Sequence, residues 1–261
     1  MKLIPSRKTP EVRAGNMSVV EHLTELRHRI VICLWAVGGA AIAAWFLYEP
    51  FVDLIRKPYC AFVTQHPTLA GPTGCDLVFT SPIDGMLVKM KTVLFIAIGL
   101  ALPILLFQLW AFIVPGLTSR EKKWSIPFVV SSFMLFVLGG LFAYYTLPKA
   151  FEFMLGFAGA GIVPLLSFDR YLGFVFFVTL AFGLSFLLPV LLVFLELVGV
   201  VRPETLSKYR RYAIFLIFLF AAIITPSSDP YTMLALGIPM YLFYEAAIII
   251  GRFAKRRSKA S

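Results

Sequence analysis

Two carboxylates, Glu25 and Glu121, stand out because each lies in a segment that is otherwise rich in Lys and Arg. A carboxylate can hold a guanidinium through two parallel hydrogen bonds, a geometry that an ammonium group cannot reproduce. Each acid also has local candidates for pairing: Arg29 lies four residues after Glu25, and Lys122 and Lys123 follow Glu121 directly. Spacing alone therefore favours ordinary local ion pairs, with recognition of an external arginine as the alternative.

Two further acids, Glu196 and Glu245, fall inside long apolar segments. A carboxylate within a bilayer costs at least about 2.5–3.5 kcal/mol unless it is neutralised, paired or hydrated. For Glu196 we expect a protonated or interfacial side chain near the end of its segment. Glu245 is expected either to pair with a polar group on a partner helix or to extend toward the interface beside Arg252.

The sequence contains no recognisable catalytic or metal-binding pattern. Its three His residues do not pair with cysteines at ligand spacing. It also lacks a P-loop or catalytic-triad string. We therefore expect a protein that uses no cofactor or metal and is not an enzyme.

The composition indicates an integral membrane protein. Of the 261 residues, 59% are hydrophobic and only 15% are charged, against about 25% charged residues in soluble domains. The mean hydropathy is +0.86. A net charge of +10 would also suit a nucleic-acid-binding protein, but the basic residues occupy short segments between apolar runs, where membrane topology explains them. We expect no nucleic-acid partner.

Six apolar segments indicate membrane helices, and they cover residues 30–47, about 86–114, 124–147, 171 to about 201, 212–224 and about 231–250. The fifth has only 13 residues and would reach about 20 Å as a helix, whereas the hydrocarbon core is about 30 Å thick. It is either a short span that thins the bilayer or half of a re-entrant hairpin. The predicted fold is an all-α, polytopic membrane protein with six transmembrane helices, of which the fifth and sixth are short.

The distribution of positive charge sets the expected orientation. Most of the 24 Lys and Arg lie in the N-terminal segment, two loops and the C-terminal tail, so the positive-inside rule places both termini in the cytoplasm. The predicted domains are a basic N-terminal segment (1–29), a membrane domain (30–251) and a basic tail (252–261). The predicted external loops are about 48–85, 148–170 and 225–230, and the cytoplasmic loops are about 115–123 and 202–211.

Two of the three cysteines, Cys60 and Cys75, lie in the first predicted external loop. An oxidising compartment permits a disulfide between them, and closing a loop of about 15 residues would stabilise the fold by roughly 3 kcal/mol in the chain-entropy model. The alternative is two unpaired thiols. Cys33 lies inside the first apolar segment and is expected to act as a small apolar residue.

Four short motifs are more specific than hydropathy, namely HLTELRHR (22–29), QLWAFIVPGL with a following REKK (108–123), AFGLSF (181–186) and IPMY (238–241). Together with the six apolar segments, they resemble TatC, the receptor subunit of the twin-arginine protein translocase, over about residues 17–253. The resemblance implies a core receptor in a bacterial-type cytoplasmic (inner) membrane, which binds signal peptides carrying paired arginines. It also implies export of folded proteins, driven by the proton-motive force. The implied partners are TatA- and TatB-like single-span proteins, membrane lipids and further copies in a receptor complex.

The same resemblance assigns roles at the cytoplasmic face. Glu25 and Glu121 match the signal-binding acids of the family, and together they could read two adjacent arginines, at about 1.5–3 kcal/mol for each contact. Arg27 would orient these acids or the lipid headgroups. Phe112 and Pro115 would form the floor of the pocket beside Glu121, or serve only as helix-end packing.

The resemblance also assigns partner or groove contacts. Pro58 matches a family proline in the first external loop, where it could equally be an ordinary loop proline. Leu187 stands where many relatives carry Glu or Gln, so that polar group is missing here, and Glu196 lies nine residues further on. Asp229 is expected to cap the sixth segment or contact the groove. In that segment Tyr241 belongs to a family motif and Glu245 matches a family acid.

The signal's apolar part is then expected to slide along a concave groove between spans, in a locally thin bilayer. A small-solute secondary transporter is the alternative function, and it would require coupled polar groups at the bilayer midplane. Glu196 and Glu245 are the nearest candidates for such groups. A membrane-embedded hydrolase would need a nucleophile and a base, which the sequence does not offer.

Overall fold

The computed structural model describes residues 19–65, 74–113, 125–156, 166–225 and 230–260. Within these ranges the chain forms nine helices and one isolated bridge between Val78 and Ser167. The helices are α1 (Val19–Phe46), α2 (Tyr48–Gln65), α3 (Asp84–Ile113), α4 (Ser125–Gly156), α5 (Phe168–Ser185), α6 (Leu188–Leu197), α7 (Pro203–Lys208), α8 (Arg210–Ile224) and α9 (Pro230–Ala260). The prediction of an all-α fold is confirmed.

Five helical stretches are long and apolar enough to cross a membrane, and they are Val20–Phe46, Asp84–Phe112, Ile126–Gly156, Phe168–Leu197 and Pro230–Phe253. The fifth predicted segment forms α8, whose 15 residues reach about 22 Å, less than the roughly 30 Å of a hydrocarbon core. The chain is therefore a multi-pass membrane protein. A six-span topology stays a prediction, because it depends on whether α8 crosses fully.

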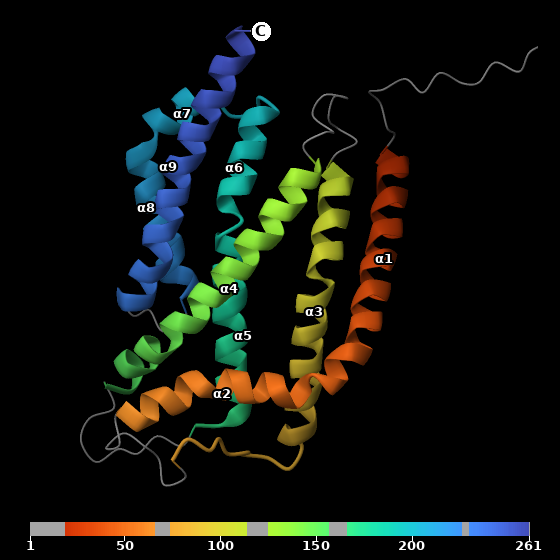
Figure 1. The fold of residues 1–261 in the computed structure, drawn as a ribbon, viewed down its shortest axis with the longest axis vertical. Helices are drawn as coiled ribbons and strands as arrows, with labels where there is room; N and C mark the ends of the chain where they lie inside the picture. The colour runs from red at the N-terminus through yellow and green to blue at the C-terminus, as the bar shows by residue number, and fades with distance from the viewer. Residues whose placement is uncertain (1–18, 66–73, 114–124, 157–165, 226–229, 261) are drawn as a thin grey trace, which may run out of the picture.

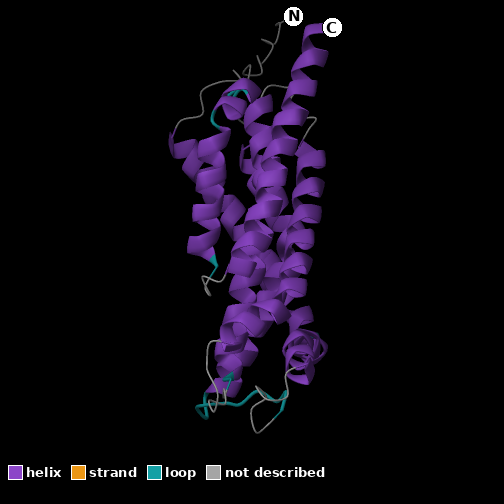
Figure 2. Ribbon diagram, turned by 90° about the vertical axis from the view of Figure 1, so that its left-hand side faces the viewer, coloured by secondary structure: helices purple, strands orange, loops and turns teal. Residues whose placement is uncertain are grey.

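The helices run along the long axis of the molecule, and α2 crosses them at one end (Figure 1; Figure 2 gives the view turned by 90°). The opposite end holds the start of α1, the end of α3 and the end of α9, and we call it the terminal end. Along the axis α1 packs on α3, α4 on α5, and α9 on both α6 and α8. The largest buried side chains of the core include Phe62, Leu147, Tyr171, Phe182 and Met240.

Three of the predicted loops contain helices, and the boundaries of the membrane domain stay a prediction. The helix α2 lies within 48–85, α4 runs on to Gly156 through Pro148, and α7 lies within 202–211. The sequence did not predict α2, because this helix is amphipathic and contains Pro58, so it shows no continuous apolar run. The predicted tail is also helical, since α9 continues to Ala260.

Pro58 is a buried helical residue and not a loop proline. Because a proline has no N–H, it leaves the carbonyl four residues earlier without its helical donor. That carbonyl belongs to Leu54, and it accepts a hydrogen bond from the Tyr144 hydroxyl of α4 at 3.0 Å. The next carbonyl, that of Ile55, accepts one from the buried Tyr171 hydroxyl of α5 at 2.5 Å. The proline therefore frees the Leu54 carbonyl for α4, and the Ile55 carbonyl gives α5 a second point of attachment to α2.

A disulfide joins Cys60 of α2 to Cys75, 15 residues further along the chain. Nearby, Arg56 forms an ion pair with Asp76 at 2.7 Å. Both links tie α2 to the segment that leads to α3. They cross-link the end of the molecule opposite the terminal end.

The fourth predicted segment is broken into α5 and α6 at Phe186 and Leu187. Pro189, in the first turn of α6, explains the break, because it cannot donate a hydrogen bond to the carbonyl of Ser185. The backbone amides of Phe186 and Leu187 donate hydrogen bonds to the carbonyls of Phe182 and Leu184, so both amides at the break have acceptors.

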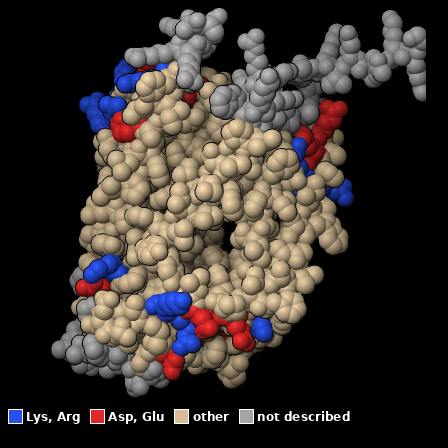
Figure 3. All heavy atoms as spheres, in the orientation of Figure 1, with Lys and Arg blue, Asp and Glu red and all other residues tan. Residues whose placement is uncertain are grey.

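Charged side chains gather toward the two ends of the face drawn in Figure 3, with an uncharged band between them. This distribution fits a molecule whose middle lies in hydrocarbon, where an unpaired charge is costly. The ion pair Lys91–Asp169 joins the first part of α3 to the start of α5 at 2.6 Å, and Arg210–Glu245 joins the start of α8 to the middle of α9 at 2.7 Å.

Candidate functional site

At the terminal end, Glu25 and Arg29 of α1 and Gln108 of α3 form one polar group, which we call the Glu25 cluster. Arg29 makes an ion pair with Glu25, one turn away, through its Nη2 and the carboxylate Oε1. Its Nη1 donates a hydrogen bond to Gln108 Oε1 at 3.3 Å. The Glu25 and Arg29 side chains are only 23% and 18% exposed. The pair is therefore more than a solvated surface contact, because it also joins two spans.

The local pairing that the spacing favoured for Glu25 is thus present. The carboxylate also keeps a second oxygen, Oε2, which is buried and has no hydrogen-bond partner among the described residues. The same holds for Nε of Arg29. Because a buried polar atom without a partner is costly, this cluster has unused capacity to accept and donate hydrogen bonds.

Phe112, near the end of α3, stacks on His22 of α1, with ring centroids 4.4 Å apart. The ring pair closes the α1–α3 contact one turn before Glu25. Arg27 is exposed on α1. Glu121 and Pro115 lie outside the described residues, in the segment between Ile113 and Ser125.

An aromatic cluster that was not predicted supports the same end of the molecule. Trp110 of α3 is buried, stacks on Phe128 of α4 at 5.0 Å and meets Phe194 of α6 edge-on at 4.9 Å. Its Nε1 donates a hydrogen bond to Ser132 Oγ of α4 at 3.1 Å. Trp110 lies inside the motif at 108–117, which was the available signal. The cluster fixes the helix ends on either side of the segment that contains Glu121.

Glu245 of α9 has a partner within the chain. Its Oε2 lies 2.7 Å from Nη2 of Arg210 on α8, and its Oε1 accepts a hydrogen bond from the Tyr241 hydroxyl at 3.3 Å. Arg252, named in one of the two alternatives for this acid, donates to Ser207 Oγ at 2.8 Å. Arg210 begins α8, so the pair fastens the short helix to α9.

Glu196 of α6 lies against Gly251 of α9. A Cβ atom added at Gly251 would fall 1.9 Å from Glu196 Oε2, so the carboxylate occupies the space that the glycine leaves. Both carboxylate oxygens are buried and have no hydrogen-bond partner among the described residues. Leu187 lies at the α5–α6 break and is partly buried. Asp229 lies outside the described residues.

Replacing Glu196 with leucine is expected to raise the free energy of unfolding by about 1–3 kcal/mol, because the change removes an unpartnered buried polar group at similar volume. Thermal unfolding of the purified protein in detergent measures this change. Glu245→Leu is the matched control and should lower the unfolding midpoint, since it leaves Arg210 without its carboxylate. A lower midpoint for Glu196→Leu would show that the acid has a stabilising partner.

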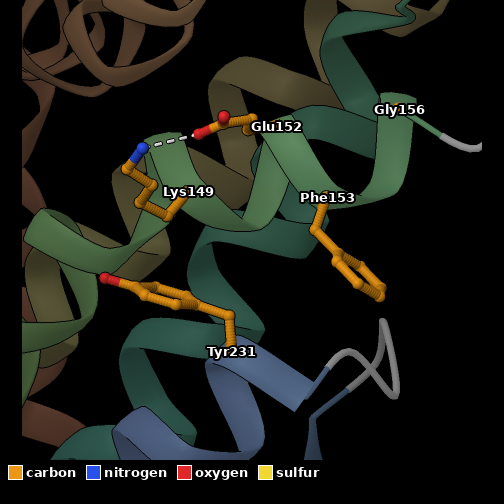
Figure 4. A pocket seen from close by; sticks show the side chains of 5 residues that line it. All are labelled: Lys149, Glu152, Phe153, Gly156 and Tyr231. Atoms are coloured by element: carbon orange, nitrogen blue, oxygen red, sulfur yellow. Dashed lines mark hydrogen bonds and ion pairs between the residues drawn. The ribbon is translucent and has the colours of Figure 1, made fainter.

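A cavity of about 630 Å³ lies between the end of α4 and the start of α9 (Figure 4). Its lining residues are Lys149, Glu152, Phe153, Gly156 and Tyr231. Lys149 and Glu152 form an ion pair across its rim at 2.7 Å. The residues predicted to form a site do not line it. Among the described residues, no three His, Cys, Asp or Glu side chains are grouped so that they could hold a metal ion.

The helical fold, the apolar spans and the polar cluster at one end define a multi-pass α-helical membrane protein. The chain matches the family described as Sec-independent protein translocase protein (TatC) over residues 21–239. It belongs to the TatC family. It is accordingly a receptor subunit of a protein translocase and not an enzyme.

Individual relatives match over most of their length. The TatC protein of Frankia casuarinae is 42% identical over 255 residues, which cover 96% of this chain and 70% of that protein. The TatC protein of Aquifex aeolicus is 36% identical over 247 residues, covering 93% and 98%. A crystal structure of the twin-arginine translocase receptor TatC superposes with a TM-score of 0.70 at 35% identity, covering 90% of this chain and all of that one. A second crystal structure of that receptor, in DDM, superposes with a TM-score of 0.72.

Proposed function

We propose that the terminal end faces the cytoplasm and receives twin-arginine signal peptides through Glu25 and Glu121. The bound peptide then passes its apolar part along a groove between spans. Single-span TatA- and TatB-like proteins complete the translocase, which exports folded proteins across a bacterial-type inner membrane at the expense of the proton-motive force. Several copies of the receptor associate in this complex.

The observation that carries the proposal is that Glu25 already binds a guanidinium, that of Arg29, in a half-buried position between two spans. An arginine site needs a carboxylate held in place, partial exclusion of water and a free acceptor oxygen. The Glu25 cluster offers all three. Glu121 would supply the second carboxylate from the segment that begins directly after α3.

The membrane geometry gives indirect support. The helix α8 reaches about 22 Å, so a bilayer around it would be thinned on that side. In Figure 1, α8 and α9 meet well short of the level of α2. A local thinning of this kind would shorten the apolar path that a passenger protein has to cross.

The test is export of a folded reporter that carries a twin-arginine signal, in cells with the complete translocase. Glu25→Ala combined with Glu121→Ala should lower export by at least about a hundredfold, since each lost charge-assisted contact corresponds to about tenfold or more in binding. Glu21→Ala, on the same helix one turn earlier, is the matched control and should export normally. Normal export by the double variant, at wild-type protein levels, would refute the mechanism.

A further inference from the structure

We propose that Arg29 is a specificity-determining residue of this receptor: it occupies Glu25 as an internal stand-in for a signal arginine, and a signal binds by exchanging its own guanidinium for that of Arg29. The inference rests on the proposed function and adds how arginine is preferred over lysine. It assigns a role to Arg29 and Gln108 that differs from structural pairing alone.

The contacts of Arg29 show that the acid is occupied before any peptide arrives. Its Nη2 is paired with Glu25 Oε1, while its Nη1 donates to Gln108 Oε1 at 3.3 Å. The Arg29 side chain is only 18% exposed, so water competes weakly for its guanidinium. Any cation that binds Glu25 must therefore displace, or share the carboxylate with, a guanidinium that is already in place.

Gln108 makes that displacement feasible. It is neutral, lies on the facing helix and already accepts one hydrogen bond from Arg29. When an incoming group takes Glu25, Arg29 can stay on Gln108 without being left unpartnered between the spans. The buried second oxygen of Glu25, which has no partner among the described residues, gives the incoming guanidinium a place to begin the exchange.

The exchange discriminates because an incoming guanidinium can make more hydrogen bonds to the carboxylate than the resident one does. Arg29 holds Glu25 through Oε1 alone, whereas an arriving guanidinium can bind both oxygens through two parallel hydrogen bonds. An ammonium group makes a compact single-point contact, so it gains no hydrogen bond over the occupant. Displacing Arg29 lowers the apparent affinity of both ligands by the same factor, so the occupied carboxylate sets a threshold. The guanidinium, with its extra hydrogen bond, binds above this threshold, and the ammonium does not.

The experiment compares twin-arginine and twin-lysine versions of one folded reporter in cells that contain the complete translocase. Arg29→Lys should raise export of the twin-lysine reporter relative to the twin-arginine one by roughly tenfold, the equivalent of one hydrogen bond to a charged group. The reason is that a resident ammonium is a weaker competitor and lowers the threshold: the twin-lysine signal then binds, while the twin-arginine signal, which already binds, gains little. Arg211→Lys, a matched change on α8, should leave the ratio unchanged.

A second variant tests whether the Gln108 side chain retains Arg29 after its displacement from Glu25. Gln108→Leu should lower export of the twin-arginine reporter, because it removes the acceptor that retains displaced Arg29. Combining it with Arg29→Lys should restore part of that loss. Photocrosslinking of both signals to the receptor in membrane vesicles shows whether the change lies in binding.

Two results would overturn the inference. The first is an unchanged export ratio in Arg29→Lys at wild-type protein levels. The second is an equal loss of both reporters at such levels, which would make Arg29 a structural or direct binding group. The proposed function is tested separately, with the receptor that carries both Glu25→Ala and Glu121→Ala. Normal export of both reporters by that double variant would refute the proposed function.

Discussion

Replacement of Gly139 with valine is expected to leave little folded protein in the membrane. Gly139 lies where α4 crosses α5, and a Cβ atom there would fall 2.7 Å from the Phe182 carbonyl oxygen and 2.9 Å from Gly183 Cα. Both are backbone atoms of α5, so no side-chain rotation relieves the clash. Even alanine should cost about 1–3 kcal/mol, the usual range for overpacking, and valine more.

Two other glycines, Gly140 of α4 and Gly39 of α1, provide controls for Gly139. At Gly140 a Cβ atom would meet the Thr179 methyl carbon at 3.4 Å, an ordinary contact. At Gly39 of α1 nothing lies within 4 Å. Gly140→Ala and Gly39→Ala should therefore unfold within a few degrees of the parent, and Gly139→Ala well below it. Equal unfolding midpoints for all three alanine variants in detergent would show that α4 and α5 do not pack this closely.

The sequence predicts the spans well, because a long uncharged apolar run has few alternatives to a membrane helix. Each of the six apolar segments corresponds to helix, including the short α8. The amphipathic α2 was missed for the opposite reason. Its buried side chains, among them Ile55, Tyr59 and Phe62, recur at helical spacing, but polar residues and Pro58 lie between them. Their burial depends on contacts with α4 and α5, far away in the sequence.

The candidate site was predictable only where its partners are close in the chain. The ion pair between Glu25 and Arg29 follows from a spacing of four residues on a helix. Gln108 lies 79 residues from Arg29, and Arg210 lies 35 residues from Glu245, so neither contact follows from local periodicity. The fit of Glu196 against Gly251 likewise requires the packing of α6 on α9. The roles of Glu25 and Glu121 came from motif resemblance and stay predictions.

Reversing the charge of Arg210 should detach α8 from α9. Arg210 Nη2 lies 2.7 Å from Glu245 Oε2, and Arg210→Glu places a second carboxylate opposite Glu245, replacing an attraction with a repulsion. Because Arg210 is 43% exposed, we expect a loss of about 1.5–3 kcal/mol, the range for hydrogen bonds to charged groups, and not the larger cost of a fully buried pair. The unfolding midpoint in detergent should fall accordingly, and export with it.

The exchanged pair, Arg210→Glu with Glu245→Arg, separates the ion pair from other effects of the substitution. It should recover most of the lost stability, since opposite charges again face each other across the helices. Recovery would be incomplete, because the Tyr241 hydroxyl now donates to Glu245 and an arginine offers no acceptor there. A double variant as unstable as Arg210→Glu alone would mean that α8 is held by its apolar contacts with α9. The short helix would then depend on this apolar packing, and not on the charge pair, for its position beside the last span.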